Sequence, residues 1–522
     1  MSDPSSLEQD PARPLRRSGG HEARSATRRA PPATLPPQGM PGGAYRPLSD
    51  ADVQRILKAA YRVLETIGMG LIGDMPDGAK AILANGAGLS PDNRILIPQS
   101  MVEDALVLVP RSWTLYGTDA ARSIEIAPGK AHYGTAGGAV NILDSKTGRY
   151  RDTTLADLYD MARLVDTLPH IRWCYRTPIA RDMETVELLD INTAYGLVRG
   201  TSKPLGITLG SAANVRAVVK LFDLVLGREG QFRKTPCAHM VQGAGVPPLR
   251  FAADRCLIKE EAIRQGFPIM IASAPQAGAT SPAALAGTLV QVTAESLAGI
   301  VYANAVSPGC PLTFAPWPFV SDLRTGAMSG GSGEQALLMA GAAQIGLHLG
   351  IPCSVAAGMA DSKLPDAQSG YEKACTTLLA GQAGASMVHE AAGMHASLMG
   401  CSLESFVIDN DMLGSVLRTI RGIEVDEDLL SVDVIREVVI GGPGHYLGSA
   451  QTLRVMQSEY HYPSLSDREM PSVWEQKGSK DIFERAQEYV AKILAQHHPR
   501  YIDDRVDEKI RSLFDIRLPP RP

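Results

Sequence analysis

From residue 155 onward, short apolar runs alternate with longer segments whose apolar residues recur at helical spacing. Each run has the length of a buried strand, and parallel strands need crossover connections of this helical kind. The stretch 351–394 shows the unit most clearly, as a strand, a polar loop, a helix and a second strand. The pattern predicts eight strands, at 171–176, 204–209, 236–242, 268–273, 311–316, 352–357, 386–390 and 404–408.

Eight strands alternating with helices predict an α/β fold, a (β/α)8 TIM-type barrel. An open doubly wound sheet would give the same local signals, and the number of strands favours the barrel. Residues 48–110 show three helical periodicities, and residues 112–151 alternate in the manner of short strands. The predicted domains are a disordered tail (1–44), an N-terminal helical and small β extension (45–154), the barrel (155–424), and a C-terminal helical extension packed on the barrel (425–522).

Composition, net charge and cysteine spacing limit the classes of protein to which this sequence can belong. The 522 residues are 44% hydrophobic with a net charge of −5, which gives no support to nucleic-acid binding. The sequence contains no run of about 18 apolar residues, so we predict no membrane span. The Pro- and Arg-rich tail lacks the apolar region of a signal peptide. The seven cysteines form no CxxC pair, so we expect free buried thiols in a reducing cytoplasm.

Polar and aromatic side chains follow several predicted strands, where a barrel would bring them to one mouth. His389 and Glu390 end the seventh strand, and we predict that they are the catalytic pair. No HExxH, GxGxxG fingerprint or GxxxxGK[ST] motif is present, so no metal or nucleotide site is predicted. Aromatic or polar candidates for substrate binding are Tyr133, Tyr175, Trp317, Phe319, Asp361 and Gln368.

Several motifs together resemble the trimethylamine methyltransferase family. They are GGPGHYLGSAQTL from residue 441, EYHYPSLSDR from 459, DSKLPDAQSGYEKA from 361 and GASMVHEAAGM from 384, and the likeness runs from about residue 45 to the end. The family forms (β/α)8 barrels and moves a methyl group from an amine to the cobalt of a separate corrinoid protein. Some members that demethylate trimethylamine carry pyrrolysine, whereas this sequence has only standard residues.

The resemblance therefore implies the subgroup that acts on glycine betaine and related quaternary amines. It implies a corrinoid protein as partner, with no cofactor held tightly by this chain, and a homo-oligomer is expected. In this interpretation His389 holds the anionic end of the substrate, and Glu390 orients it or faces the cation. The aromatic residues Trp317, Phe319, Tyr133 and Tyr175 would cage the cation, while His445 and Tyr446 would line the mouth.

Two other functions remain open on the sequence alone. A metal-dependent barrel lyase or hydrolase could assemble ligands from Asp361, His389 and Glu390. A non-catalytic barrel could bind betaine-like cations without transferring a methyl group.

Overall fold

The structure is a computed structural model that describes residues 39–243 and 245–521. The predicted tail falls almost wholly on residues 1–38, which lie outside the described residues. The described chain divides into two compact units. One comprises residues 39–422 and 463–521, and the other is Ile423–Tyr462.

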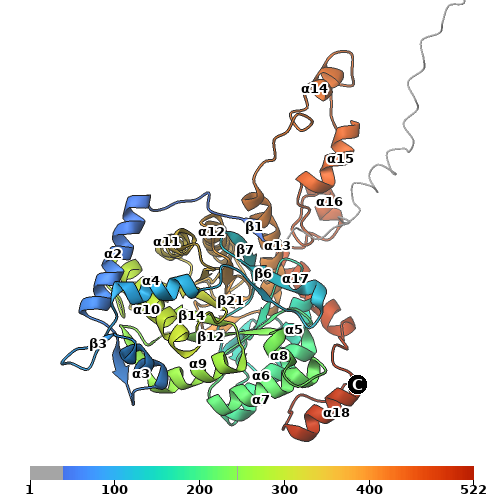
Figure 1. Cartoon of the computed structure of the whole chain (residues 1–522). Coiled ribbons are helices and arrows are strands. Elements are labelled where there is room, and N and C mark those ends of the chain that lie inside the picture. Colours follow the sequence, from blue (N-terminus) through green and yellow to red (C-terminus); the bar gives the residue numbers. More distant parts are fainter. Residues whose placement is uncertain (1–38, 244, 522) are drawn as a thin grey trace, which may run out of the picture. The chain divides into compact units, whose positions relative to one another are not determined.

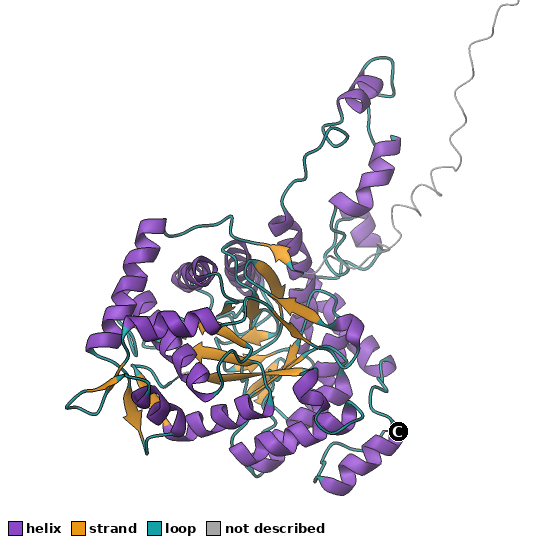
Figure 2. Ribbon diagram, viewed as in Figure 1, coloured by secondary structure: helices purple, strands orange, loops and turns teal. Residues whose placement is uncertain are grey.

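Seven of the eight predicted strands are present in the larger unit, and all are parallel to their neighbours. Their backbones are buried because helices cover one side of the sheet and packed side chains the other, as is usual for parallel strands. Figure 2 shows the strands lying inside the surrounding helices. The seven strands are β10 (Cys174–Tyr175), β11 (Leu205–Ile207), β12 (Ala238–Gly243), β14 (Ile269–Ser273), β16 (Leu312–Pro316), β19 (Ser354–Ala356) and β20 (Met387–His389).

The predicted eighth strand is wrong. Residues 404–408 lie in one long helix, α13 (Leu403–Arg421), whose first turn is capped by the Ser402 hydroxyl. The eighth parallel strand comes from the region assigned to the N-terminal extension: β7 (Lys130–Tyr133) pairs in parallel with β20. The central sheet therefore begins before residue 155.

Helices connect and cover the strands (Figure 1). Helix α10 (Leu285–Val306) is the one described helix long and apolar enough to cross a membrane, but 72% of its apolar stretch is buried inside the protein, as in a core helix. The connecting helices are α5 (Leu155–Asp166), α6 (Val186–Gly200), α7 (Ala212–Val225), α8 (Gln231–Lys234), α9 (Ala253–Gln265), α10 (Leu285–Val306), α11 (Gly333–Leu349) and α12 (Ala367–Gln382).

The remaining elements either precede the central sheet in the sequence or are short strands within its loops. N-terminal elements are β1 (Met40–Pro41), α2 (Asp50–Thr66), β2 (Gly70–Ile72), α3 (Asp77–Ala84), β3 (Gly88–Leu89), β4 (Ile95–Leu96), α4 (Gln99–Leu108), β5 (Trp113–Leu115), η1 (Ala120–Arg122), β6 (Ile124–Ile126), β8 (Asn141–Asp144) and β9 (Arg149–Asp152). Loop strands are β13 (Arg250–Ala252), β15 (Gln276–Ala277), β17 (Phe319–Ser321), β18 (Met328–Ser329), β21 (Met394–His395) and β22 (Gly400–Cys401).

Five helices follow α13. Helix α17 (Ile482–Gln496) starts with a capping box formed by Asp481 and Glu484. Within the larger unit, Arg163 of α5 donates hydrogen bonds to the carbonyls of Leu494 and His497, which anchors the end of α17. The five helices are α14 (Val432–Val439), α15 (Ala450–Glu459), α16 (Pro471–Gln476), α17 (Ile482–Gln496) and α18 (Asp504–Leu513).

A buried ion pair joins α12 to α13. The Lys373 ammonium donates to the Asp409 carboxylate at 2.7 Å, and both side chains are almost fully buried. The same carboxylate oxygen accepts the backbone N–H of Gly393 at 2.7 Å. Because both charges have left water, each depends on the other for compensation.

We predict that Lys373→Met destabilises the protein by about 3–5 kcal/mol, because it leaves Asp409 as an uncompensated buried carboxylate. Lys477→Met removes an exposed pair with Glu469 and is the matched control, with an expected loss below about 1 kcal/mol. Thermal unfolding of both variants is the measurement. Equal midpoints for the two variants would contradict the structural role assigned to the pair.

Candidate functional site

The chain turns sharply where β20 ends. Glu390 follows His389 with a φ of +63°, a left-handed conformation that is uncommon for residues other than glycine. The backbone is held on both sides of it: His389 O accepts the N–H of Ala357 at 2.9 Å, and Ala391 N donates to Gly134 O at 3.1 Å. Adjacent strands therefore impose the turn, which leaves Glu390 lining a cavity at the end of the strand.

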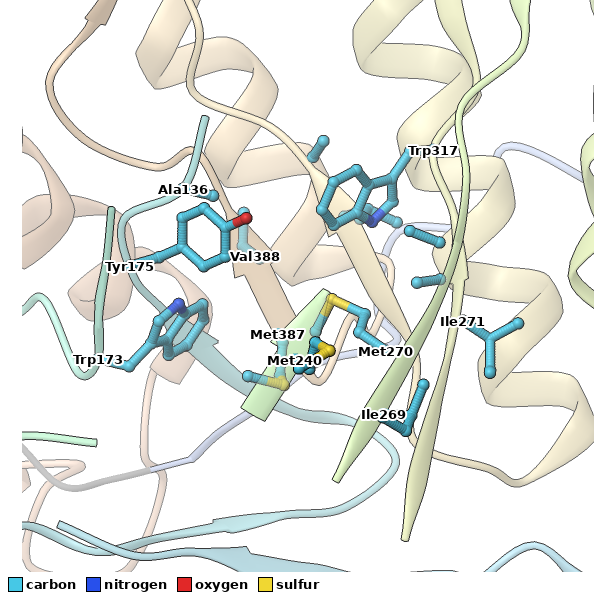
Figure 3. Close-up of a cluster of buried hydrophobic side chains, with 14 of the residues drawn as sticks. Ala136, Trp173, Tyr175, Met240, Ile269, Met270, Ile271, Trp317, Met387 and Val388 are labelled. Atoms are coloured by element: carbon cyan, nitrogen blue, oxygen red, sulfur yellow. The ribbon is translucent and has the colours of Figure 1, made fainter. Parts of the chain in front are cut away.

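This cavity measures about 180 Å³ and is mostly apolar. Its walls come from the segments that follow β7, β16, β20 and β21, and from residues of β10 and β12 themselves. Figure 3 shows the Tyr175 and Trp317 side chains on one side of the buried cluster, with Trp173 and three methionines beneath them. The lining residues are Ala136, Gly137, Gly138, Tyr175, Val241, Trp317, Glu390 and Leu398.

Glu390 is the one charged group that lines the cavity. Its side chain is buried, and Oε2 has no hydrogen-bond partner among the described residues. Burial raises the pKa of Glu390 to about 8, because the ionised form loses its hydration and gains nothing in return. The site therefore accommodates either a proton on Glu390 or a cation beside it.

His389 lies beneath the cavity wall, and it is absent from the residues that line the cavity. Its Nδ1 is 3.1 Å from Ser354 Oγ, which also accepts the indole N–H of Trp317 at 3.3 Å. Its Nε2 is 3.1 Å from Nε2 of His239. One set of protons satisfies all three contacts: Trp317 donates to Ser354, Ser354 to His389, and His389 to His239.

Both histidines are neutral. Burial, and then the neighbouring His239, hold the pKa of His389 well below the usual histidine value. Burial also lowers the pKa of His239 to about 3. A neutral imidazole has no charge to offer an anion, so the geometry suits His389 to fixing Trp317 rather than to holding an anionic group.

Glycines allow this aromatic cluster to pack closely. A Cβ on Gly134 would lie 2.1 Å from the Trp173 ring, and one on Gly206 would lie 2.4 Å from Tyr175 and 2.8 Å from His239. The ring centroids of Trp173 and His389 are consequently only 4.7 Å apart. The sequence pattern missed Trp173, His239 and Ser354, although the alternation along each strand could have indicated which side chains share a face.

The other predicted site residues lie elsewhere. The Tyr133 hydroxyl donates to the carbonyl of Thr377 in α12, and Phe319 belongs to β17 without lining the cavity. Gln368 donates to Glu372 within α12. None of these three residues lines the cavity that contains Glu390. His445 and Tyr446 are exposed residues of the smaller unit.

Asp361 ties three loops together. Its carboxylate accepts the Ser329 hydroxyl and the Gly330 N–H, both at 2.6 Å, and the Ser397 hydroxyl at 2.8 Å. Leu398, the next residue, lines the cavity. Asp361 therefore positions the loop that closes the site, and its carboxylate is already occupied by these donors.

A larger cavity of about 400 Å³ lies among β15, β17, β18 and the first turn of α11. No aromatic residue lines it, and its Asp322 and Arg324 pair with each other near the surface. The smaller cavity combines two aromatic rings with an unpaired buried carboxylate, which is the stronger sign of a binding site. Within residues 39–243 and 245–521, no three His, Cys, Asp or Glu side chains form a metal-binding group.

Comparison with known proteins identifies the family. A sequence model of trimethylamine methyltransferase matches residues 16–518. Trimethylamine methyltransferase MttB of Methanosarcina thermophila is 32% identical over 82% of this chain and 89% of its own length. Glycine betaine methyltransferase of Desulfitobacterium hafniense (strain Y51) is 28% identical over 91% of this chain and 97% of its own length.

Among solved structures, the hydroxylamine complex of MtmB shares the fold, with a TM-score of 0.50 at 12% identity over 85% of this chain and 88% of that one. Neither the family nor these relatives support a metal-dependent lyase or a non-catalytic binding barrel. The chain belongs to the trimethylamine methyltransferase family, and it is a methyltransferase.

Proposed function

We propose that the protein transfers a methyl group from a quaternary methylamine, such as glycine betaine, to the Co(I) of a corrinoid carried by a partner protein. The observation that carries the proposal is the cavity in which the Glu390 carboxylate lies among Trp317 and Tyr175. Relatives named for trimethylamine and for glycine betaine support a methylated amine as donor. Six of the seven free cysteines are buried, which agrees with a reducing, cytoplasmic setting.

We also propose that the eight parallel strands close into a (β/α)8 barrel. Two backbone hydrogen bonds support closure of the barrel, in addition to the hydrogen bonds of the regular strand pairs. Arg172 N donates to Tyr133 O at 2.7 Å between the segments of β7 and β10, and Phe314 N donates to Pro352 O at 3.0 Å between β16 and the start of β19. In such a barrel the cavity occupies the C-terminal mouth, where substrates bind.

The cavity fits the chemistry of a trimethylammonium group. Such a group has no N–H to donate, so it is recognised by aromatic faces and by negative charge. Trp317 and Tyr175 supply the faces, and Glu390 supplies the charge once the cation displaces its proton. An apolar cavity of roughly 150 Å³ holds a molecule the size of benzene, so about 180 Å³ is ample for this head group.

Methyl transfer from a quaternary amine needs positioning more than acid or base catalysis. The C–N bond breaks with its electron pair left on nitrogen, so the amine leaves uncharged and needs no proton. The docked corrinoid supplies the nucleophile. Glu390 binds the cation more strongly than the less charged transition state, so its contribution is to substrate capture and orientation. His389 holds Trp317 through Ser354 and thereby keeps the cavity wall in place.

Arg176 is suited to the carboxylate of a betaine. It directly follows Tyr175, and its guanidinium lies 6.0 Å from the centroid of that ring. Its Nε is buried without a hydrogen-bond partner among the described residues. Within the protein, the Arg176 charge acts on the Asp190 carboxylate. A substrate whose ammonium lies at Glu390 and whose carboxylate reaches Arg176 would give Glu390 a counter-charge and Arg176 Nε a hydrogen-bond acceptor.

The function is tested by incubating the purified protein with Co(I) cobalamin and a panel of quaternary and tertiary methylamines. We expect methylation with quaternary donors and little with trimethylamine. Activity with trimethylamine alone would contradict the proposed donor class. Binding of quaternary amines without any transfer would contradict the proposed reaction.

Glu390 predicts a pH dependence of substrate capture. A cation binds the ionised carboxylate, and its pKa of about 8 makes this form scarcer as the pH falls. We expect the KM for a quaternary amine to fall about tenfold per pH unit between pH 6 and 7 and to level off above pH 8. A quaternary amine keeps its charge at every pH, so the change in KM reflects the titration of a group on the protein.

The variant Glu390→Gln tests whether this pH dependence comes from Glu390. It should raise the KM at pH 8 by at least about tenfold, with a smaller effect on kcat, and should abolish the pH dependence below pH 8. Glu334→Gln, a change at an exposed residue of α11, is the control and should behave as the wild type. A KM that is equally pH-dependent in Glu390→Gln would refute the assignment.

Arg176→Met separates the two ends of the substrate. We expect it to raise the KM for glycine betaine by about tenfold or more, because the carboxylate loses its partner, and to leave the KM for tetramethylammonium within about twofold. Kinetics with both donors, compared with Arg181→Met at an exposed position, are the measurement. Equal losses for the two donors would show that Arg176 does not bind the carboxylate.

A further inference from the structure

The hydroxyl group of Tyr175 is held by a threonine on the neighbouring strand. Thr208 directly follows β11, and its Oγ1 lies 2.5 Å from the Tyr175 hydroxyl oxygen. The Thr208 hydroxyl also donates to the carbonyl oxygen of Val241 in β12, at 2.9 Å. Since β10, β11 and β12 are neighbours in the sheet, these two contacts link three adjacent strands beside the cavity that Tyr175 and Val241 line.

The backbone brings the Tyr175 ring to Thr208. The hydroxyl of Thr135 accepts the backbone N–H of Tyr175 at 2.7 Å, which fixes the base of the side chain. The ring then crosses β11 at Gly206, where a Cβ would lie 2.4 Å from it. Residues two apart on an extended chain share a face, so Thr208 lies where the hydroxyl end of the ring arrives. Both ends of the tyrosine are therefore fixed.

These contacts assign the hydroxyl protons. Thr208 has a single hydroxyl proton and gives it to Val241 O, so Tyr175 is the donor in its contact with Thr208. The Tyr175 oxygen can then offer lone pairs to its surroundings but no proton. Figure 3 shows the hydroxyl end of Tyr175 directed to the side of the cluster where Trp317 lies, and both residues line the cavity.

We propose that Thr208 is a positioning residue that keeps the Tyr175 hydroxyl proton out of the cavity, so that the Tyr175 oxygen turns its lone pairs to the ammonium group of the substrate. The inference rests on the proposed quaternary-amine donor and adds a source of cation selectivity beyond Glu390. The N-methyl hydrogens carry part of the positive charge and make favourable contacts with oxygen lone pairs. A dipole fixed in advance inside an apolar cavity is effective because water does not screen it.

The same arrangement disfavours the demethylated product. After methyl transfer the amine nitrogen carries a lone pair, and a free hydroxyl proton in the cavity would donate to it. Because the Tyr175 proton is committed to Thr208, the product finds no such donor at Tyr175. Thr208 thereby favours the binding of the substrate over that of the amine it leaves behind.

The test compares a cation with a neutral group of the same shape. Glycine betaine and tert-butylacetate both carry a carboxylate, and they differ only in having nitrogen or carbon at the centre of the head group. Calorimetric titration of the full-length protein at pH 7 should show that the wild type prefers glycine betaine. In Thr208→Val we expect the Kd for glycine betaine to rise about fivefold and that for tert-butylacetate to stay within about twofold. Retained binding of tert-butylacetate shows that the variant is folded.

Three further variants sharpen the comparison. Thr208→Ser keeps the hydroxyl and should restore the wild-type preference to within about twofold. Thr66→Val, at an exposed position of α2 where the hydroxyl donates to Arg62 O, is the matched control and should bind both ligands as the wild type does. Tyr175→Phe should weaken the binding of glycine betaine, and adding Thr208→Val to it should cause no further loss, because both act through one hydroxyl.

Equal losses for the two ligands in Thr208→Val would overturn the inference, by showing that Thr208 maintains only the shape of the cavity. Unchanged affinity for glycine betaine would also overturn it, as would additive losses in the double variant or a wild type that does not prefer the cation. The proposed function fails in a different way. A preference for the cation that depends on Thr208, without methyl transfer to Co(I), would support this assignment and contradict the proposed reaction.

Discussion

The buried carboxylate of Glu390 is the constraint on which the site depends. An ionised carboxylate loses several kcal/mol of hydration on burial unless a partner replaces it, and the protein offers Oε2 none among its described residues. The left-handed turn after β20 places it in an apolar cavity, and Gly134, Ala357 and Ala391 hold that turn by backbone hydrogen bonds. The fold therefore buries a carboxylate whose ionised form is unfavourable in the free protein and would be stabilised by a cationic ligand.

The cavity wall is kept rigid by a chain of hydrogen bonds beneath it. Trp317 is tied through Ser354 to His389 and His239, both held neutral by burial. Glycines at 134 and 206 allow the Trp173, Tyr175 and His239 rings to lie closer to the backbone than any side chain would permit. A reaction that depends on aligning a methyl group with an incoming nucleophile benefits from such preorganisation, because misalignment cannot be repaired by an acid or a base.

Most of the sheet was predictable because buried parallel strands are short apolar runs, and seven such runs are strands. The eighth was misplaced for a physical reason. Residues 404–408 contain strand-forming side chains but follow a capping serine and continue as a helix, whereas β7 is four residues long and lies among antiparallel pairs. The sequence indicates that His389 and Glu390 end a strand, but it does not reveal the left-handed backbone at Glu390, so it could not predict which of the two lines the cavity.

Calorimetric titration with a quaternary amine at pH 7, in buffers of different ionisation enthalpy, measures whether cation binding expels the Glu390 proton. With a pKa of about 8, Glu390 is mostly protonated in the free protein, and a cation beside it must expel that proton. We expect release of about 0.9 proton per ligand bound, and none in Glu390→Gln. Tight binding by the wild type without proton release would contradict it.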